Sequence, residues 1–178
     1  MEYQIIRSAR KTISLQITPE GKLLVRCPNR MTAAEVDKFV RSKESWIRSH
    51  LQKRPPALPP FTEAEIKALA ARAKQVIPAR VAFFAPRVGV TYGNITIRSQ
   101  RTRWGSCSSK GNLNFNCLLM LTPPEVVDYV VVHELCHRKE MNHSAKFWAR
   151  VERILPDWKL RRKWLKDNGN SLIGRLPG

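Results

Sequence analysis

An apolar run that leads directly into three polar side chains constrains the fold of this chain more than any other feature. The segment VVDYVVV, residues 126–132, is followed at once by HELCH, and together they predict a buried helix over residues 125–140. His133, Glu134 and His137 lie on that helix, where burial without partners costs about 1 to 3 kcal/mol for each polar side chain. These three residues must therefore share a purpose inside the protein.

The spacing of the two histidines predicts a metal site. Residues four apart on a helix lie one above the other, so His133 and His137 present their imidazoles to the same point. Zinc suits neutral imidazoles, and a site with three protein ligands keeps a fourth position for a water whose pKa falls to about 7. Glu134 is placed to take a proton from that water instead of binding the metal itself. We therefore expect one Zn²⁺ per chain, with Glu134 as the catalytic residue.

A third ligand is expected directly after this helix. Three of the four histidines fall between His133 and His143. Asn142 tolerates the left-handed conformation that stops a helix, and Ser144 is a suitable cap for the next one. This short corner would return His143 to the helical pair, so the predicted metal ligands are His133, His137 and His143. Glu152, on the following helix, is the alternative third ligand.

Alternation and capping patterns predict the other elements. TISLQIT and KLLVRCP flank the turn PEGK and predict an antiparallel hairpin. Thr32 with Glu35 and Thr62 with Glu65 are capping boxes, so one helix begins at each threonine. The first ends before RPPALPP, and the second continues to Pro78, which kinks or ends it.

Further strands and helices follow in the second half. NITIR, RTRWGSC and GNLNFNC predict strands, the last two of which are joined by a turn at residues 110–112. Helices are expected at 144–155 and 158–166, and the end of the chain is expected to be a loose tail. Cys136, Tyr129 and Trp104 are interpreted as core residues.

Length and composition favour one soluble domain. A chain of 178 residues that is 43% apolar fills one core, with an N-terminal part over 1–54, a catalytic core over 61–167 and a tail over 168–178. The four cysteines form no Cys-x-x-Cys pair and no apolar signal segment precedes them, so a cytoplasmic location with reduced thiols is expected. No apolar run reaches the about 20 residues of a membrane span.

Positive charge is concentrated in one segment. The net charge is +18, and no acidic residue occurs between Glu65 and Glu125. Such a field attracts nucleic acid, nucleotides or acidic peptides, although a solvated basic surface has the same pattern. The candidate substrate-binding residues lie in this segment: Arg98, Arg101, Arg103, Lys110, Asn114 and Asn116. The four cations would neutralise phosphates, and LNFN, which contains both asparagines, is the candidate edge strand for pairing with a peptide.

The stretch TRWGSCSSKGNLNFNCLLMLTPPEVVDYVVVHELCHRKEMNHSAKFW resembles the YgjP-like metallopeptidase family, a zincin group akin to the SprT-like proteases and the WLM domains. RSARKTISLQITPEGKLLVRCP and FVRSKESWI extend the resemblance to the N-terminal part. The resemblance implies an α+β, zincin-like fold: a small, mostly antiparallel sheet packed on the active-site helix, preceded by a β-meander and a helix. It also implies zinc bound by His133, His137 and His143, with Glu134 as general base.

Three functions are compatible with these residues. The first is a zinc metallopeptidase, and the second is a metal-dependent nucleotide phosphohydrolase, such as a nucleoside triphosphate pyrophosphatase, with the basic segment as its phosphate clamp. The third is a nucleic-acid-binding module with a vestigial metal site, which an intact Glu134 disfavours because structural zinc usually has four protein ligands and no base. The expected partners are thus a peptide or nucleotide substrate and, through the basic surface, nucleic acid. The oligomeric state does not follow from the sequence.

Overall fold

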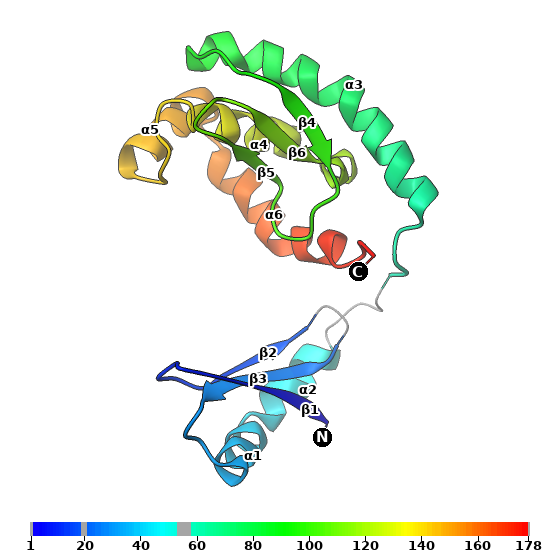
Figure 1. Cartoon of the computed structure of the whole chain (residues 1–178), viewed down its shortest axis with the longest axis vertical. Coiled ribbons are helices and arrows are strands. Elements are labelled where there is room, and N and C mark those ends of the chain that lie inside the picture. Colours follow the sequence, from blue (N-terminus) through cyan, green and yellow to red (C-terminus); the bar gives the residue numbers. More distant parts are fainter. Residues whose placement is uncertain (1, 19–20, 53–57, 178) are drawn as a thin grey trace. The chain divides into compact units, whose positions relative to one another are not determined.

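The computed structural model describes residues 2–18, 21–52 and 58–177, and it divides into two compact units, Met1–Leu58 and Pro59–Gly178 (Figure 1). Each unit has a hydrophobic core of its own. The mixed α+β class predicted from the sequence is confirmed. Among the described residues, no helix combines the length and the apolar character that a membrane crossing requires.

The first unit is a three-stranded sheet with two helices. Its elements are β1 (Tyr3–Ser8), β2 (Ser14–Ile17), β3 (Leu23–Pro28), α1 (Ala33–Ser42) and α2 (Glu44–Gln52). Alternate residues of β3, namely Leu23, Val25 and Cys27, enter a core that Val36, Val40 and Ile47 of the helices complete. The predicted capping box at Thr32 and Glu35 begins α1, but the single helix expected here is divided at Lys43, the C-cap of α1.

The strand order of this first sheet differs from a meander. The predicted hairpin of β2 and β3 is present and antiparallel, although Pro19 and Glu20 of its turn lie outside the described residues. β1, however, pairs in parallel with β3, so the order is β1-β3-β2. A meander would place β2 in the centre. Alternation of apolar residues marks β2 and β3 but contains no information on which further strand pairs with them.

The second unit holds the candidate site. Its elements are α3 (Glu63–Val88), β4 (Ile95–Arg98), β5 (Gly105–Cys107), β6 (Leu113–Asn116), the 3₁₀ helix η1 (Cys117–Leu121), α4 (Pro124–Cys136), α5 (Ala145–Ile154) and α6 (Trp158–Ile173). Figure 1 shows the sheet of β4, β6 and β5 among α3, α4 and α6. α4 is central, because it contacts α3, α5, α6 and β5. Its apolar run is buried on nearly all sides, as predicted.

α3 is longer than the sequence predicts. Thr62 and Glu65 form the expected capping box, but the helix passes through Pro78 and Pro86 and ends only at Val88, where Gly89 adopts a left-handed φ of 74°. A proline inside a helix removes one backbone hydrogen bond, and burial of an apolar face can offset that loss. Val81, Phe84 and Val88, all beyond Pro78, are buried in the core. The prediction that Pro78 ends or kinks the helix took no account of this packing.

The second sheet is mixed, with order β4-β6-β5. β6 pairs in parallel with β4 and antiparallel with β5, and the β5–β6 turn contains Gly111 with a φ of 88°, within the predicted 110–112 turn. The sheet is therefore not mostly antiparallel: it has one pair of each kind. β6, which is LNFN, is its central strand, so the prediction that LNFN is an exposed edge is wrong. β4 and β5 are the edges among the described strands.

The C-terminal segment is not a loose tail. α6 continues to Ile173, seven residues beyond its predicted end, and Leu176 is buried in the core of the unit. Arg175 then joins the end of the unit to its beginning: its carbonyl accepts from the Phe61 amide at 2.8 Å, and its Nε donates to the Pro59 carbonyl at 2.8 Å. The predicted tail therefore contributes to the folded unit.

Candidate metal centre

Two elements and the short link between them position the three histidines. His133 lies inside α4, and His137 is the C-cap of that helix, with ordinary right-handed φ and ψ of −63° and −18°. Among the described residues only glycines have positive φ, so the predicted left-handed Asn142 is wrong. The chain instead leaves the helix through hydrogen bonds from the Lys139 and Glu140 amides to the Cys136 carbonyl, at 3.0 and 3.1 Å.

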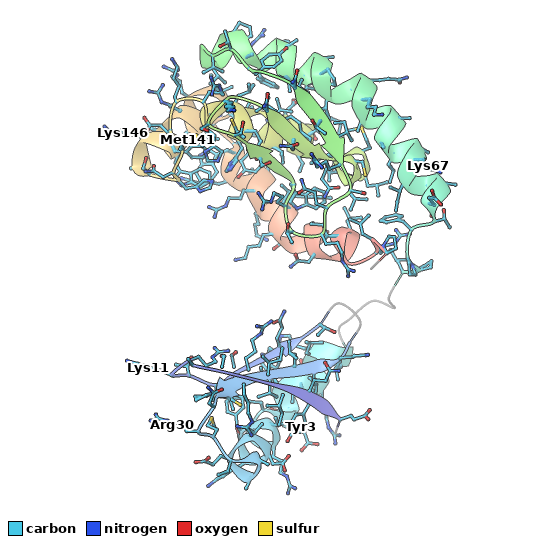
Figure 2. The ribbon with its side chains drawn as sticks, viewed as in Figure 1. Tyr3, Lys11, Arg30, Lys67, Met141 and Lys146 are labelled. Carbon is cyan, nitrogen blue, oxygen red and sulfur yellow. The ribbon has the colours of Figure 1, made fainter. Side chains whose placement is uncertain are left out.

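The predicted cap of the next helix is present. Ser144 precedes α5, and its hydroxyl accepts from the Phe147 amide at 3.4 Å. Asn142 supports this corner from its side chain, because its Oδ1 accepts from the Ser144 amide at 3.3 Å. Met141, 58% exposed, lies in the same link, and Figure 2 shows it and Lys146 of α5 on this part of the unit. The link brings His143 back to α4 without a left-handed residue.

The three imidazoles converge on one point. His137 Nε2 and His143 Nε2 lie 3.2 and 3.0 Å from His133 Nε2, and the possible ligand atoms of all three lie within 4.8 Å of one another. Nitrogens bound at about 2.0 to 2.1 Å in a tetrahedral zinc site are about 3.3 Å apart. The spacing in the structure is close to that value, so these residues fit a metal ion. Glu152 is not in this group and forms an ion pair with Lys159 at 3.7 Å.

The surroundings hold the imidazoles in orientations that suit metal binding. His137 Nδ1 lies 3.0 Å from the Glu140 carbonyl oxygen, which fixes the proton on Nδ1 and leaves Nε2 free to bind a metal. The Phe147 ring packs against all three imidazoles, with centroid distances of 4.5 to 4.9 Å. His133 Nδ1 is buried and has no hydrogen-bond partner among the described residues.

Burial keeps the helical histidines neutral. Desolvation, assisted by the neighbouring His137 and His143, lowers the pKa of His133 to about 3, and desolvation also lowers the pKa of His137. Only the neutral imidazole has a lone pair for a metal. His133 and His137 are therefore in their metal-binding form at neutral pH.

Glu134 is buried beside the cluster. It is 5% exposed, and burial raises its pKa to about 8, while the positive charge of Arg103 acts in the opposite direction. Its carboxyl lies directly against Gly105 of β5: a Cβ on that glycine would be 2.6 Å from Oε1. Gly105 therefore leaves the space that the carboxyl occupies, and it allows the edge strand β5 to lie close to α4.

The predicted substrate-binding residues have different positions in the structure. Asn116 is fully buried, and its Nδ2 donates to the carbonyls of Gln100 and Arg103 at 2.7 and 3.1 Å. Asn114 accepts from Arg98 Nε at 3.2 Å and donates to the Ser106 hydroxyl at 3.2 Å. Both asparagines thus hold the sheet and the segment before β5. Their role in substrate binding stays a prediction.

The four predicted cations are all exposed but differ in their relation to the site. Arg98 lies on β4, Arg101 in the link to β5, and Lys110 in the β5–β6 turn. Only Arg103 has an electrostatic effect on Glu134. Arg162 of α6 also contributes to lowering the pKa of His133, after burial and the neighbouring histidines. Its proximity depends on how α6 packs on α4, and no motif in the sequence indicates that.

The family model for the YgjP-like metallopeptidase domain matches residues 11–68 and 59–168, which together span most of the chain. The chain belongs to the YgjP-like metallopeptidase family. Membership implies a metal-dependent hydrolase with a peptide substrate, and the three histidines are the candidate metal site within the matched residues. The search of curated proteins gave no match.

Two crystal structures of archaeal metallopeptidase zymogens are similar to part of this YgjP-like chain. Pyrococcus abyssi abylysin is 23% identical, over 51% of this chain and 94% of its own, with a TM-score of 0.46. Methanocaldococcus jannaschii jannalysin is 22% identical, over 49% of this chain and 93% of its own, with a TM-score of 0.43.

Proposed function

We propose that the chain is a zinc-dependent peptidase in which His133, His137 and His143 bind one zinc ion and Glu134 is the general base. The observation that carries the proposal is the convergence of three Nε2 atoms at 3.0 and 3.2 Å beside a buried carboxyl. A zinc ion held by three histidines lowers the pKa of a bound water to about 7 and polarises a substrate carbonyl. Three neutral nitrogens match the ligand preference of zinc better than that of magnesium or calcium, which prefer oxygen.

Glu134 supplies the proton transfers. Its carboxylate accepts a proton from the attacking water and then donates it to the amine that leaves when the peptide bond breaks. Burial raises the pKa of this carboxyl, which favours donation of the proton in the second step, whereas acceptance in the first step requires the ionised form. Gly105 allows the carboxyl to lie close to the backbone of β5.

β5 is the best candidate for holding an extended peptide. It pairs with β6 on one side only, and it contacts α4. A peptide that pairs with the free edge of β5 would run past Glu134, with alternate side chains on either side of the sheet. This role replaces the one predicted for LNFN.

A test of the general base compares two glutamate variants of the zinc-loaded protein on an unstructured protein substrate. Glu134→Gln should retain the fold and the zinc and lower kcat by a factor of about 100 to 10,000, because an amide accepts no proton. Glu152→Gln is the matched control: its side chain is exposed and ion-paired with Lys159, so activity should be unchanged. Full activity of Glu134→Gln would refute the assignment.

A test of the metal ligands uses the fourth histidine as its control. The double variant His133→Ala/His137→Ala should lose its zinc, measured by elemental analysis, because one remaining imidazole does not hold the ion. His50→Ala, which removes a histidine stacked on Trp46 in the first unit, should keep one zinc per chain. If the double variant keeps a full equivalent of zinc, the metal site lies elsewhere.

A nucleotide phosphohydrolase is the second candidate, and one observation favours it. Arg103 and Arg162 place positive charge near Glu134 and His133, the two residues at the centre of the site. The same water-activating chemistry attacks phosphorus when cations neutralise the phosphates. The two functions are separated by incubating the zinc-loaded protein with a panel of nucleoside triphosphates and, in parallel, with the unstructured protein substrate. The class of compound that is hydrolysed by the parent but not by Glu134→Gln identifies the substrate.

A further inference from the structure

A stack of aromatic rings extends from the metal centre to α6. The Trp148 ring is stacked on His143, with centroids 5.6 Å apart at an interplanar angle of 25°, and on Trp158, with centroids 4.3 Å apart at 14°. The Arg162 guanidinium lies 4.9 Å from the Trp148 ring centroid and 6.0 Å from that of Trp158. The flat faces of the indoles support this guanidinium, so its position relative to His143 is defined although Arg162 is exposed.

A second guanidinium comes from the segment before β5. The Arg103 carbonyl is held by Asn116 Nδ2 at 3.1 Å, and Arg103 precedes by two residues the glycine that contacts Glu134. The next residue, Trp104, packs on Gly169 of α6, where a Cβ would lie 3.0 Å from the indole. Gly169 is two helical turns, about 10 Å, beyond Arg162 on the same face of α6. Arg103 and Arg162 therefore belong to segments that meet along one face of that helix.

Neither guanidinium is neutralised within the described part of the chain. Arg103 and Arg162 take part in no ion pair and no side-chain hydrogen bond with a described residue. Glu134 is the acidic group whose charge interacts with Arg103, and it belongs to the proposed reaction centre. The other nearby acidic side chains are paired with other cations: Glu152 with Lys159 at 3.7 Å, Asp157 with Arg161 at 2.9 Å, Glu140 with Arg150 at 3.8 Å, and Asp167 with Lys163. The donors of the two arginines are available to an anion from outside, and a guanidinium binds carboxylate and phosphate oxygens in pairs.

We propose that Arg103 and Arg162 form an anion subsite beside the three-histidine centre, which holds a carboxylate or phosphate group of the substrate next to the bond that is cleaved. The inference rests on the proposed hydrolase function and requires that the substrate carry an anionic group beside the bond that is cleaved. An acidic side chain or chain terminus of a peptide supplies the carboxylate. A nucleotide supplies the phosphate.

The test first measures binding, in the zinc-loaded full chain with Glu134→Gln to prevent turnover. Calorimetry at fixed ionic strength uses inorganic pyrophosphate, an acetylated Asp-containing tetrapeptide and its Asn counterpart. Arg103→Ala and Arg162→Ala should each weaken binding of an anionic probe about tenfold, and Arg162→Lys should recover part of the loss, because a lysine keeps the charge but not the paired donors. Arg87→Ala is the matched control: an exposed arginine over the Phe83 ring at 3.5 Å, on α3.

Hydrolysis by the chain with Glu134 intact then identifies the source of the anion. If both arginine variants lose more hydrolytic activity on the Asp peptide than on the Asn peptide, the anion is a carboxylate. If they lose hydrolytic activity on a nucleoside triphosphate, the anion is a phosphate. The inference is overturned if the Arg103 and Arg162 variants bind and cleave the probes like the parent. It is also overturned if Arg87→Ala weakens binding as much as those variants do, because the effect then comes from the net charge of +18. If anion binding depends on both arginines but no probe is hydrolysed, the proposed hydrolase function is refuted while the anion subsite is supported.

Discussion

Gly105 has a role that only its missing side chain explains. Its φ is not in the left-handed region, so the backbone alone would accept alanine, but a Cβ would lie 2.6 to 2.9 Å from three atoms of the Glu134 side chain. Contacts below 3.0 Å force something to move. Glu134 is buried, with little room to withdraw. The position of the carboxyl is thus set by a residue on another element.

Gly105→Ala should lower the free energy of unfolding by about 1 to 3 kcal/mol, as overpacking in a well-packed interior does. In a Glu134→Ala background, which removes the three crowded atoms, the same change should cost much less. Urea unfolding of the four proteins gives this coupling. An equal loss in both backgrounds would show that Gly105 acts through something other than Glu134.

At this scale the sequence predicted the site residues that local spacing connects. Helical periodicity was enough to bring His133 and His137 together. The shortness of the link placed His143 beside them, although the left-handed Asn142 expected there is absent. Gly105 and Arg162 were missed because their relation to the site depends on how β5 and α6 pack on α4. The substrate-binding role predicted for Asn114 and Asn116 stays a prediction. Alternation could not indicate that the Asn116 amide is buried and holds two backbone carbonyls.

At the scale of elements, α3 shows how a short signal starts a long helix. The Thr62 hydroxyl accepts from the Glu65 amide at 3.2 Å, and Glu65 Oε2 accepts from the Thr62 amide at 2.7 Å. Hydrogen bonds from the Thr62 backbone and side chain lower the pKa of Glu65 below its ordinary value. A lowered pKa in the folded state means that the ionised carboxylate stabilises the fold above the ordinary carboxyl pKa. That contribution is lost as pH falls through the lowered value.

Thr62→Ala should therefore lower the free energy of unfolding by about 1 kcal/mol at neutral pH. Glu65→Gln should lower the melting temperature at pH 7, and the difference from the parent should vanish at acidic pH, once the carboxyl of the parent is protonated. Glu63→Gln is the control: it lies in the same first turn, near the same helix dipole, but it pairs with Lys67 and does not cap. A pH dependence equal for both glutamates would indicate the dipole, not the capping box.

Caps and hairpins were predictable because their signals are local, whereas strand order was not. The boxes at Thr32 and Thr62, the cap at Ser144 and the β5–β6 turn all lie within a few residues of the features they determine. The parallel pairing of β1 with β3 and of β4 with β6 joins strands that are distant in the chain. Pro78 is the converse case, since the local signal is strong and the core packing beyond it prevails.

At the scale of the molecule, the whole candidate site lies in one unit. Every residue proposed to bind metal or substrate falls within Pro59–Gly178, and the larger core contains only residues of that unit. Arg175 closes the unit near its start, with hydrogen bonds to Phe61 and Pro59 and with its guanidinium 3.8 Å from the Phe61 ring centroid. The unit thus has the contacts of an independently stable domain.

A fragment of residues 59–178 should fold cooperatively and bind one zinc, measured by thermal unfolding and elemental analysis. A fragment of residues 59–173 should melt at a lower temperature, because it lacks Arg175 and the buried Leu176. Equal melting temperatures would indicate that the end of the chain is the loose tail predicted from its sequence. If the fragment of residues 59–178 does not fold, the first unit is required for folding of the second.

The stacked Trp148 and Trp158 rings have an optical consequence. Two indole chromophores whose centroids are 4.3 Å apart share their electronic excitation, and they give a paired positive and negative band in circular dichroism where their transition dipoles lie at an angle to each other. Because Trp148 is also stacked on His143, the strength of that couplet depends on the order of the link between α4 and α5. Spectroscopy without any added dye can therefore follow the assembly of the metal centre in solution.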